Sequence, residues 1–332
     1  MKMPSRHSRS LSRSRTCSLL WGVVPLILTV SACQMEEISA RGDVPRVLAT
    51  TTMITEAATR IGGECVEVRG LLPVGGDPHV YEPVPRDARA ITESDLVLYN
   101  GFGLEGWLDR LVRNAGGERP IVEVSDGLTP IYGQYAGGQD PDPHLWMSVQ
   151  HFIRYVENTR DALAGMAPDC RSVLDANAAA YRDELQALEA WVHESVATIP
   201  ERNRYLVTSH DAFQYYAEAF GLEVLGTPIG LSTDEEASAQ TVARIVDDVR
   251  RTGIPALFVE TTVNPNLIRR IAAESGASIG GTLYSDSLGP PGSGAESYVG
   301  MIVHNTRTIV NALGGTAGSF EHGGVTYTGG EG

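Results

Sequence analysis

The chain has 332 residues, of which 42% are hydrophobic and 20% are charged. That length and apolar fraction suit two ordinary globular domains and argue against a disordered polyampholyte. With 26 basic against 41 acidic residues, the formal net charge is −15. Nucleic acid and anionic lipid surfaces repel so acidic a protein, which excludes nucleic acid as a partner and favours cations.

The first residues have the pattern of a secretion signal. Five basic residues without an acid precede an apolar run at 19–30, and small residues follow it. This order predicts a signal peptide over residues 1–32, because the run is too short, and too interrupted by Pro25, to span a membrane. Val30-Ser31-Ala32-Cys33 resembles a bacterial lipobox, in which Cys33 carries lipid. A plain signal peptide cleaved near Ala32, or an uncleaved anchor, is the alternative.

The lipoprotein interpretation places the mature chain outside the cytoplasm, tethered to a membrane by lipid through residues 33–45 without spanning it. Removing five basic groups and no acid leaves 21 basic against 41 acidic residues, a net charge of −20. Cys65 and Cys170 then occupy a compartment where a disulfide can persist. They either pair or remain buried thiols, because sequence gives no distance between their α carbons.

Strand-like and helical segments alternate from Arg46 onward. This alternation predicts a parallel sheet covered by helices, which we assign to an N-terminal α/β lobe over residues 46–170. The expected strands are 46–51, 66–72, 95–100 and 121–125, and the expected helices are 54–63, a short helix from Pro85, 104–117 and 149–166.

A long uninterrupted helix follows. Residues 172–198 contain no glycine or proline, are rich in helix formers, and lie between Pro168 and Pro200. A helix of this length extends about 40 Å at about 1.5 Å per residue, the scale of two small lobes laid end to end. We therefore expect residues 171–200 to be a stiff connection between two lobes.

The alternation resumes after this helix, which predicts a C-terminal α/β lobe over residues 201–314. Thr233 and Glu236 form a capping pattern ahead of the helix at 238–253. Residues 315–332 are glycine-rich and are expected to form a flexible tail. The other expected elements are strands at 205–209, 222–228, 256–260 and 277–284, and helices at 211–221, 264–276 and 298–313.

Two histidines occur in similar short sequence motifs. Gly-Gly-Asp-Pro-His ends at His79, after the second strand, and Asp-Pro-Asp-Pro-His ends at His144, after the fourth. Loops beyond the carboxyl ends of parallel strands are where ligands bind. Imidazole is a common ligand of divalent transition metals, so the pair indicates a metal site. Either histidine alone fits a purely structural loop role.

The second lobe supplies two more candidates in the same topological position. His210 follows the strand at 205–209, and Asp286 follows the last strand. Capping or packing is the alternative for His210, and a turn role is the alternative for Asp286. Because each lobe contributes two ligands, the four predict an ion bound in the cleft between the lobes.

The chain resembles the TroA-like metal-binding lipoproteins that serve ABC importers. The resemblance implies ligands at His79, His144, His210 and Asp286, two lobes on one rigid helix, and delivery of the ion to a permease driven by an ATPase. We also expect a monomer. The motifs that carry the resemblance, over about residues 46–313, are GGDPHVYEP (75–83), DPHLWM (142–147), TSHDAF (208–213), FVETTVN (258–264) and GGTLYSD (280–286).

The cargo is expected to be Mn²⁺ or Zn²⁺, with Fe²⁺ a further possibility. Three imidazoles and a carboxylate suit four-coordinate zinc, and bidentate binding by Asp286 would also admit manganese or ferrous iron. In the family, histidine at position 210 favours zinc. The absence of a histidine-rich loop ahead of His144 favours manganese, which we prefer, with a zinc-specific protein as the alternative.

Glu260 ends a strand in the second lobe and either accepts a hydrogen bond from a ligand imidazole or has a packing or solvated role. Trp146 and Tyr81 are expected to shield the site from water. His151, His193 and His304 lie in predicted helices and are expected to be packing or surface residues.

The competing function classes are a zinc hydrolase and a surface adhesin. Catalytic zinc usually has three protein ligands, an open water position and a nearby base. Four protein ligands would close the site, and the sequence contains no HExxH motif. We therefore expect a binding protein rather than an enzyme; a secondary adhesin role stays open.

Overall fold

The computed structural model describes residues 44–132 and 140–330. The predicted signal peptide, Cys33 and most of the predicted tether lie outside the described residues. Within those described ranges, no helix combines the length and apolar character needed to cross a membrane.

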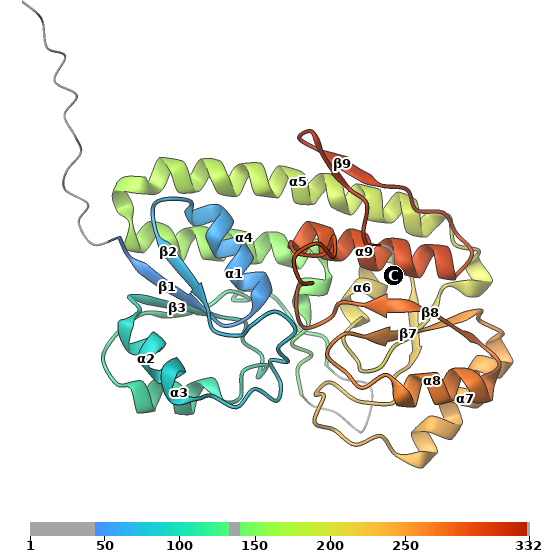
Figure 1. The fold of residues 1–332 in the computed structure, drawn as a ribbon. Helices are drawn as coiled ribbons and strands as arrows, with labels where there is room; N and C mark the ends of the chain where they lie inside the picture. Colours follow the sequence, from blue (N-terminus) through green and yellow to red (C-terminus); the bar gives the residue numbers. More distant parts are fainter. Residues whose placement is uncertain (1–43, 133–139, 331–332) are drawn as a thin grey trace, which may run out of the picture. The chain divides into compact units, whose positions relative to one another are not determined.

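The first half of the described chain builds a four-stranded parallel sheet in the order β2-β1-β3-β4, as the alternation predicts (Figure 1). Its strands are β1 (Arg46–Ala49), β2 (Glu67–Gly70), β3 (Leu96–Tyr99) and β4 (Ile121–Glu123). Its helices are α1 (Thr52–Gly62), α2 (Pro85–Glu93), α3 (Leu108–Ala115) and α4 (Val149–Met166).

The two central strands, β1 and β3, are largely buried on both faces, which explains their continuous apolar sequences. Side chains alternate between faces along a strand. Val47 and Ala49 of β1 join the largest hydrophobic core, which includes residues of α1 and α4. Leu48 between them joins a separate cluster with residues of α2 and α3. The sheet is therefore the middle layer of a three-layer α/β arrangement.

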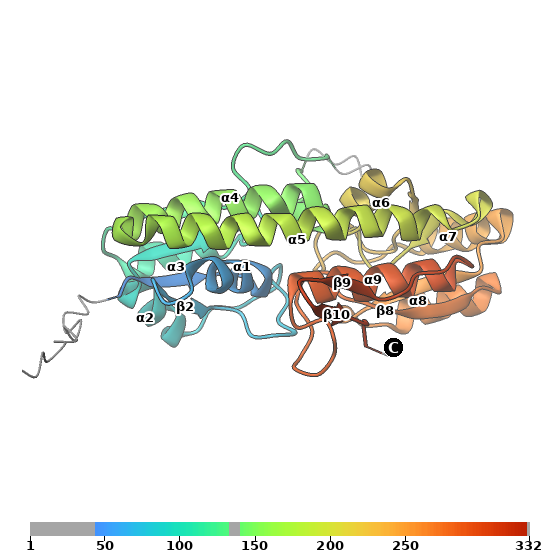
Figure 2. The ribbon, with the colours of Figure 1, turned by 90° about the horizontal axis from the view of Figure 1, so that it is seen from above.

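The long helix is α5 (Arg171–Ala197), close to the predicted limits. Its fully buried side chains recur at helical spacing and pack against α1, α4 and α9 (Figure 2). The sequence predicts that this helix is a connector between two lobes. In the structure, α5 also forms a wall of the largest hydrophobic core, which contains residues from both halves of the chain. Those buried residues are Leu174, Tyr181, Leu185, Leu188 and Val192.

The second half contains two parallel strand pairs, β5-β6 and β7-β8. Phe258 of β7 points into the core shared with α5, while Leu257 and Val259 join a cluster with α7 and α8. The elements are β5 (Tyr205–Val207), α6 (Gln214–Phe220), β6 (Glu223–Gly226), α7 (Ala239–Thr252), β7 (Ala256–Glu260), α8 (Asn266–Ser275), β8 (Ser278–Leu283) and α9 (Tyr298–Ala312).

The expected capping pattern of α7 is wrong. Ser238, immediately before the helix, is the N-cap, and its hydroxyl accepts from the backbone N–H of Thr241 at 3.0 Å. The Thr233 hydroxyl instead donates to Asp77 at 2.6 Å. An N-cap must precede the first helical turn directly, and α7 starts at Ala239, too far from Thr233 for this role.

The tail is also not the loose segment we expected. Residues Phe320–His322 (β9) and Val325–Tyr327 (β10) form an antiparallel hairpin. Gly323 and Gly324 both have positive φ, at 57° and 80°, as a tight two-residue hairpin turn requires. Phe320 is buried in the main core, and the Tyr327 hydroxyl donates to Glu184 of α5 at 2.7 Å. These aromatic contacts attach the segment to the core despite its glycine content.

Cys65 and Cys170 form a disulfide, with their α carbons 6.1 Å apart. The bond connects the segment after α1 to the start of α5. It closes a loop of 105 residues in the first half of the chain. Of the two alternatives open at the level of sequence, the structure contains the paired form.

Candidate metal centre

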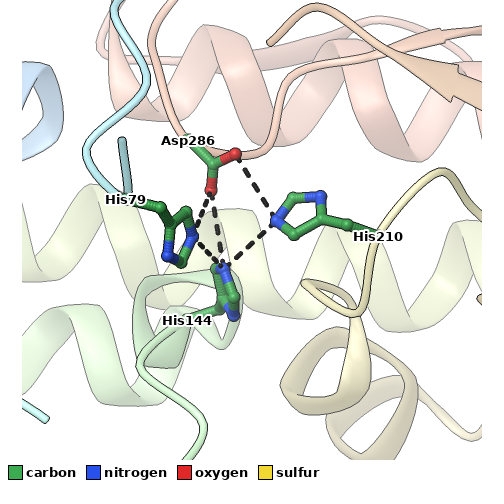
Figure 3. A group of neighbouring side chains, drawn as sticks. All are labelled: His79, His144, His210 and Asp286. Carbon is green, nitrogen blue, oxygen red and sulfur yellow. Dashed lines mark hydrogen bonds and ion pairs between the residues drawn. The ribbon is translucent and has the colours of Figure 1, made fainter. Parts of the chain in front are cut away.

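The four candidate ligands come from four loops, each placed after a parallel strand. His79 follows β2, His144 follows β4, His210 follows β5 and Asp286 follows β8. Their side chains converge on one point (Figure 3), and one donor atom from each lies within 4.8 Å of all the others. Segments up to 207 positions apart in the chain thus meet at the carboxyl ends of the strands.

The distances suit a shared ion. The Nε2 atom of His144 lies 3.1 Å from Nε2 of His79 and 3.3 Å from Nε2 of His210. Two nitrogens bound at about 2.1 Å to a tetrahedral ion lie about 3.4 Å apart. Asp286 Oδ1 lies 3.6 Å from Nε2 of His144. The four side chains therefore stand at the separations that a common metal ion imposes.

Asp286 presents both carboxylate oxygens to imidazole nitrogens. Oδ1 lies 3.8 Å from Nε2 of His79, and Oδ2 lies 3.5 Å from Nε2 of His210. Oδ2 also accepts from the Thr262 hydroxyl at 2.9 Å, whereas the buried Oδ1 has no hydrogen-bond partner among the described residues. A buried anionic oxygen without a donor is costly, so Oδ1 is the atom best suited to a cation.

Two carboxylates hold the far side of the imidazoles. Asp142 Oδ1 accepts from the backbone N–H of His144 at 2.9 Å and from its Nδ1 at 2.7 Å. Glu260 accepts from the backbone N–H of His210 at 2.9 Å and lies 2.6 Å from its Nδ1. The hydrogen bond to Asp142 places the proton of His144 on Nδ1 and leaves Nε2 free to coordinate. Glu260 Oε2 lies close to Nδ1 of His210 without hydrogen-bond geometry, so the role of Glu260 as an acceptor for that ring stays a prediction.

Sequence reasoning did not single out Asp142, although its signal was present. Both ligand-bearing loops of the first half contain Asp-Pro-His. Asp77 Oδ1 accepts from the backbone N–H of His79 at 2.9 Å, just as Asp142 Oδ1 accepts from that of His144. This is a local Asx-type hydrogen bond that fixes the loop. At His144 the imidazole ring is also turned so that Nδ1 contacts Asp142. The repeated Asp-Pro-His motif does not predict this ring orientation.

Burial and neighbouring charges shift the pKa values in this site. Burial lowers the pKa of His144, although Asp142 opposes this effect. Burial also acts to lower the pKa of His210, but the carboxylates of Glu260 and Asp286 outweigh it and raise that pKa well above its ordinary value. Burial acts to raise the pKa of Asp286, yet His210 and His79 hold it well below its usual range. These shifts favour an ionised Asp286 and a protonated His210, so a metal ion that binds Nε2 of His210 must displace a proton.

Trp146 lies beside the site. Its ring centroid is 5.2 Å from that of His144, and its Nε1 donates to the backbone carbonyl of Ser285 at 2.8 Å. The side chain is buried, which agrees with its expected shielding position. The ring of Tyr81 instead packs against Trp107, and its hydroxyl donates to Asp87.

The remaining helical histidines have the packing contacts that we expected. His151 packs against Tyr215, and His193 is an exposed residue of α5. The Nε2 atom of His304 lies 2.9 Å from the backbone carbonyl of Thr282. The helix expected at 211–221 starts only at Gln214, so His210 lies in a loop.

The chain is similar to known metal-binding proteins over most of its length. Residues 47–312 match the family model described as ZnuA, zinc-uptake complex component A, periplasmic. The chain is 38% identical over 293 residues to the manganese-binding lipoprotein MntA of Halalkalibacterium halodurans, which covers 88% of this chain and 96% of that protein. It is 36% identical over 274 residues to MntA of Bacillus subtilis, covering 81% and 89% respectively.

Solved structures share the fold. The periplasmic zinc-binding protein TroA of Treponema pallidum superposes with a TM-score of 0.76 at 32% identity, covering 81% of this chain and 99% of that one. The manganese-bound periplasmic metal-binding protein of Candidatus Liberibacter asiaticus gives a TM-score of 0.72 at 29% identity, with the same coverage. These neighbours confirm the predicted α/β architecture with a TroA-like fold.

Proposed function

Because the chain belongs to the family of the periplasmic zinc-uptake complex component A, we propose that it captures a divalent transition-metal ion outside the cytoplasm and delivers it to an ABC importer. A permease and its ATPase are then its partners. This family consists of substrate-binding components of transporters, so the chain is a binding protein and not an enzyme.

One observation carries this proposal: three imidazole Nε2 atoms and a carboxylate oxygen, buried together, converge within 4.8 Å. Nitrogen and oxygen donors of this kind suit the divalent transition metals from manganese to zinc. The carboxylates of Asp142 and Glu260 add negative charge behind His144 and His210. A bound dication offsets that charge, and we assign His79, His144, His210 and Asp286 as its ligands.

We propose manganese as the transported ion. The relatives from Halalkalibacterium halodurans and Bacillus subtilis carry manganese in their names, and both oxygens of Asp286 face imidazole nitrogens. Bidentate coordination would give five donor atoms, a number that suits manganese or ferrous iron better than it suits zinc, which prefers four. Zinc is the alternative cargo, since zinc exceeds manganese in intrinsic affinity at such a site and TroA is named for zinc.

The remaining parts of the chain fit this role. We propose that residues 46–170 and 201–314 act as two lobes on the helix at 171–200 and that Cys33 carries the lipid anchor. We also propose that the protein works as a monomer at the extracytoplasmic face of the importer, in the periplasm or at the cell surface. Lipid attachment keeps the carrier near its permease without a spanning helix. The names of the relatives as lipoproteins support the anchor.

Metal binding is tested by calorimetry and by thermal shift with Mn²⁺ and Zn²⁺. We expect binding of one ion per chain and a metal-dependent rise in melting temperature, because an ion that binds only the folded state stabilises it. His144→Ala should abolish most of this rise, while the matched control His193→Ala, at an exposed position of α5, should retain it. An unchanged metal-dependent shift in His144→Ala contradicts the assigned site.

Metal uptake by cells tests which ion is transported. We expect a deletion strain to lose uptake of radioactive Mn²⁺, and the wild-type gene, but not the His144→Ala gene, to restore it. Metal analysis of protein purified from its own organism should find manganese. Retained Mn²⁺ uptake with lost Zn²⁺ uptake would instead identify the zinc-specific alternative, and loss of neither would contradict the transport function.

A further inference from the structure

A tight turn of the second half bridges the loops that carry two of the ligands. This turn, residues 230–235, we call the cleft turn. Its Gly230 carbonyl accepts from the backbone N–H of Asp211, the residue after the ligand His210, at 3.0 Å. At its other end, the Thr233 hydroxyl donates to Asp77 Oδ2 at 2.6 Å, across 156 positions of sequence. The cleft turn is thus attached to both halves of the chain.

Asp77 transmits this contact to a ligand. Its second oxygen, Oδ1, accepts from the backbone N–H of His79 at 2.9 Å. One carboxylate therefore holds Thr233 with one oxygen and the His79 loop with the other. Hydrogen bonds to an ionised carboxylate are shorter and stronger than those between neutral groups. Movement of Thr233 away from Asp77 would loosen a restraint on the position of His79.

The cleft turn also contributes to the walls of two cavities. A cavity of about 660 Å³ is lined by His79 together with Gly230, Ser232 and Glu235 of the turn. A second cavity, of about 490 Å³, is lined by Asp77 and Thr233 among other residues. His79 is the least buried of the four ligands, since the other three residues are fully buried. The open side of the metal site is therefore the side that the cleft turn borders.

Two hydrogen bonds connect residues within the cleft turn. The backbone N–H of Glu235 donates to the carbonyl of Ser232 at 3.2 Å, and the Glu235 side chain accepts from the backbone N–H of Ser232 at 3.2 Å. These bonds hold the turn together from within. The contact between Thr233 and Asp77 is then a side-chain connection of this unit to the opposite half.

We propose that Thr233 is a positioning residue for ion release: its hydrogen bond to Asp77 latches the cleft turn beside His79 and slows dissociation of the bound metal. This inference rests on the proposed function. It assigns to the turn a role in setting the residence time of the ion, and therefore in how readily the ion passes to the permease. The hydroxyl, and not the bulk of the side chain, is the active feature.

The test measures release of Zn²⁺ from the loaded, full-length protein into excess chromophoric chelator by stopped flow. Thr233→Val keeps the shape of the side chain but removes the donor, and we expect release to accelerate about tenfold, equal to about 1.4 kcal/mol. Thr233→Ser restores a donor and should release Zn²⁺ at nearly the wild-type rate. Rescue by serine would not occur if the residue acted through packing alone.

The matched control is Thr92→Val. The Thr92 hydroxyl donates to the backbone carbonyls of Ala88 and Ala115 on the exposed surface of the first half. We expect this variant to release Zn²⁺ at the wild-type rate. Thr233→Ala serves as a second variant if the valine variant does not fold, and it should show the same acceleration.

Three outcomes overturn the inference. If Thr233→Val releases Zn²⁺ at the wild-type rate, the hydrogen bond to Asp77 does not slow dissociation. If Thr233→Ser accelerates release as much as Thr233→Val does, the hydroxyl is not responsible. Equal acceleration in Thr92→Val shows that the effect does not belong to the cleft turn. If the wild-type protein binds no Zn²⁺ or Mn²⁺ by calorimetry, the proposed function fails as well, which distinguishes that failure from loss of the latch alone.

Discussion

Asp142 offers the sharpest test of how the metal centre is organised, because it touches a ligand but lies outside the ligand set. One of its oxygens accepts two hydrogen bonds from His144, from the backbone N–H at 2.9 Å and from Nδ1 at 2.7 Å. Replacing Asp142 with alanine removes both hydrogen bonds at once. The imidazole then loses its fixed tautomer and orientation while every candidate ligand remains in the chain.

The size of the effect follows from these contacts. Loss of a carboxylate that orients a ligand imidazole typically lowers metal affinity by about 10- to 100-fold, or about 1.4 to 2.8 kcal/mol. We expect Asp142→Ala to fall in this range for Mn²⁺. Asp142→Asn keeps an acceptor oxygen but removes the negative charge behind the site, so its affinity should lie between those of the wild type and the alanine variant.

The assay is calorimetric titration with Mn²⁺, with a competing chelator where binding is too tight to measure directly. Asp109→Ala is the control, since the Asp109 side chain is 92% exposed on α3, and we expect it to bind as the wild type does. Melting curves without metal establish that each variant folds, because the buried N–H of His144 loses its acceptor in Asp142→Ala, at a cost of about 1–3 kcal/mol. A folded Asp142→Ala protein with wild-type affinity would refute the reasoning.

Two further predictions concern stability. Burial raises the pKa of Glu56 from its ordinary 4.5 to about 7, although Tyr181 and Arg60 oppose this shift. The contribution of Glu56 to stability is therefore complete below the pKa of the unfolded state and is lost as the pH rises through the pKa of the folded state. Chemical unfolding should therefore show wild-type stability falling, relative to Glu56→Gln, by about 2 kcal/mol between about pH 5 and about pH 8; equal pH profiles would contradict the raised pKa. The Cys65→Ser/Cys170→Ser protein should lose about 4 kcal/mol of stability, because the disulfide closes a loop of 105 residues. Reductant should destabilise the wild type similarly and leave the double variant unchanged, and insensitivity of the wild type would count against the bond.

The order of elements could be predicted from the sequence, because each is governed by local patterns. Residues 149–166 were expected to be a helix and are α4, and residues 256–260 were expected to be a strand and are β7. The failures are instructive. Residues 320–327 form a hairpin, because Phe320 packs in the core and Tyr327 bonds to α5, and the glycine content of this segment gives no indication of those distant partners.

Part of the metal site could likewise be predicted from local sequence patterns, and part could not. Sequence alone placed His79, His144, His210 and Asp286 after strands, and parallel strands end on a common edge, so their approach follows from local pattern and connectivity. Whether Glu260 reaches the imidazole of His210, whether Cys65 meets Cys170, and where Thr233 meets Asp77 were decided only by tertiary structure. Each depends on a few ångströms between segments far apart in the chain. That separation is set by the packing of all the intervening elements and by no residue pattern of its own.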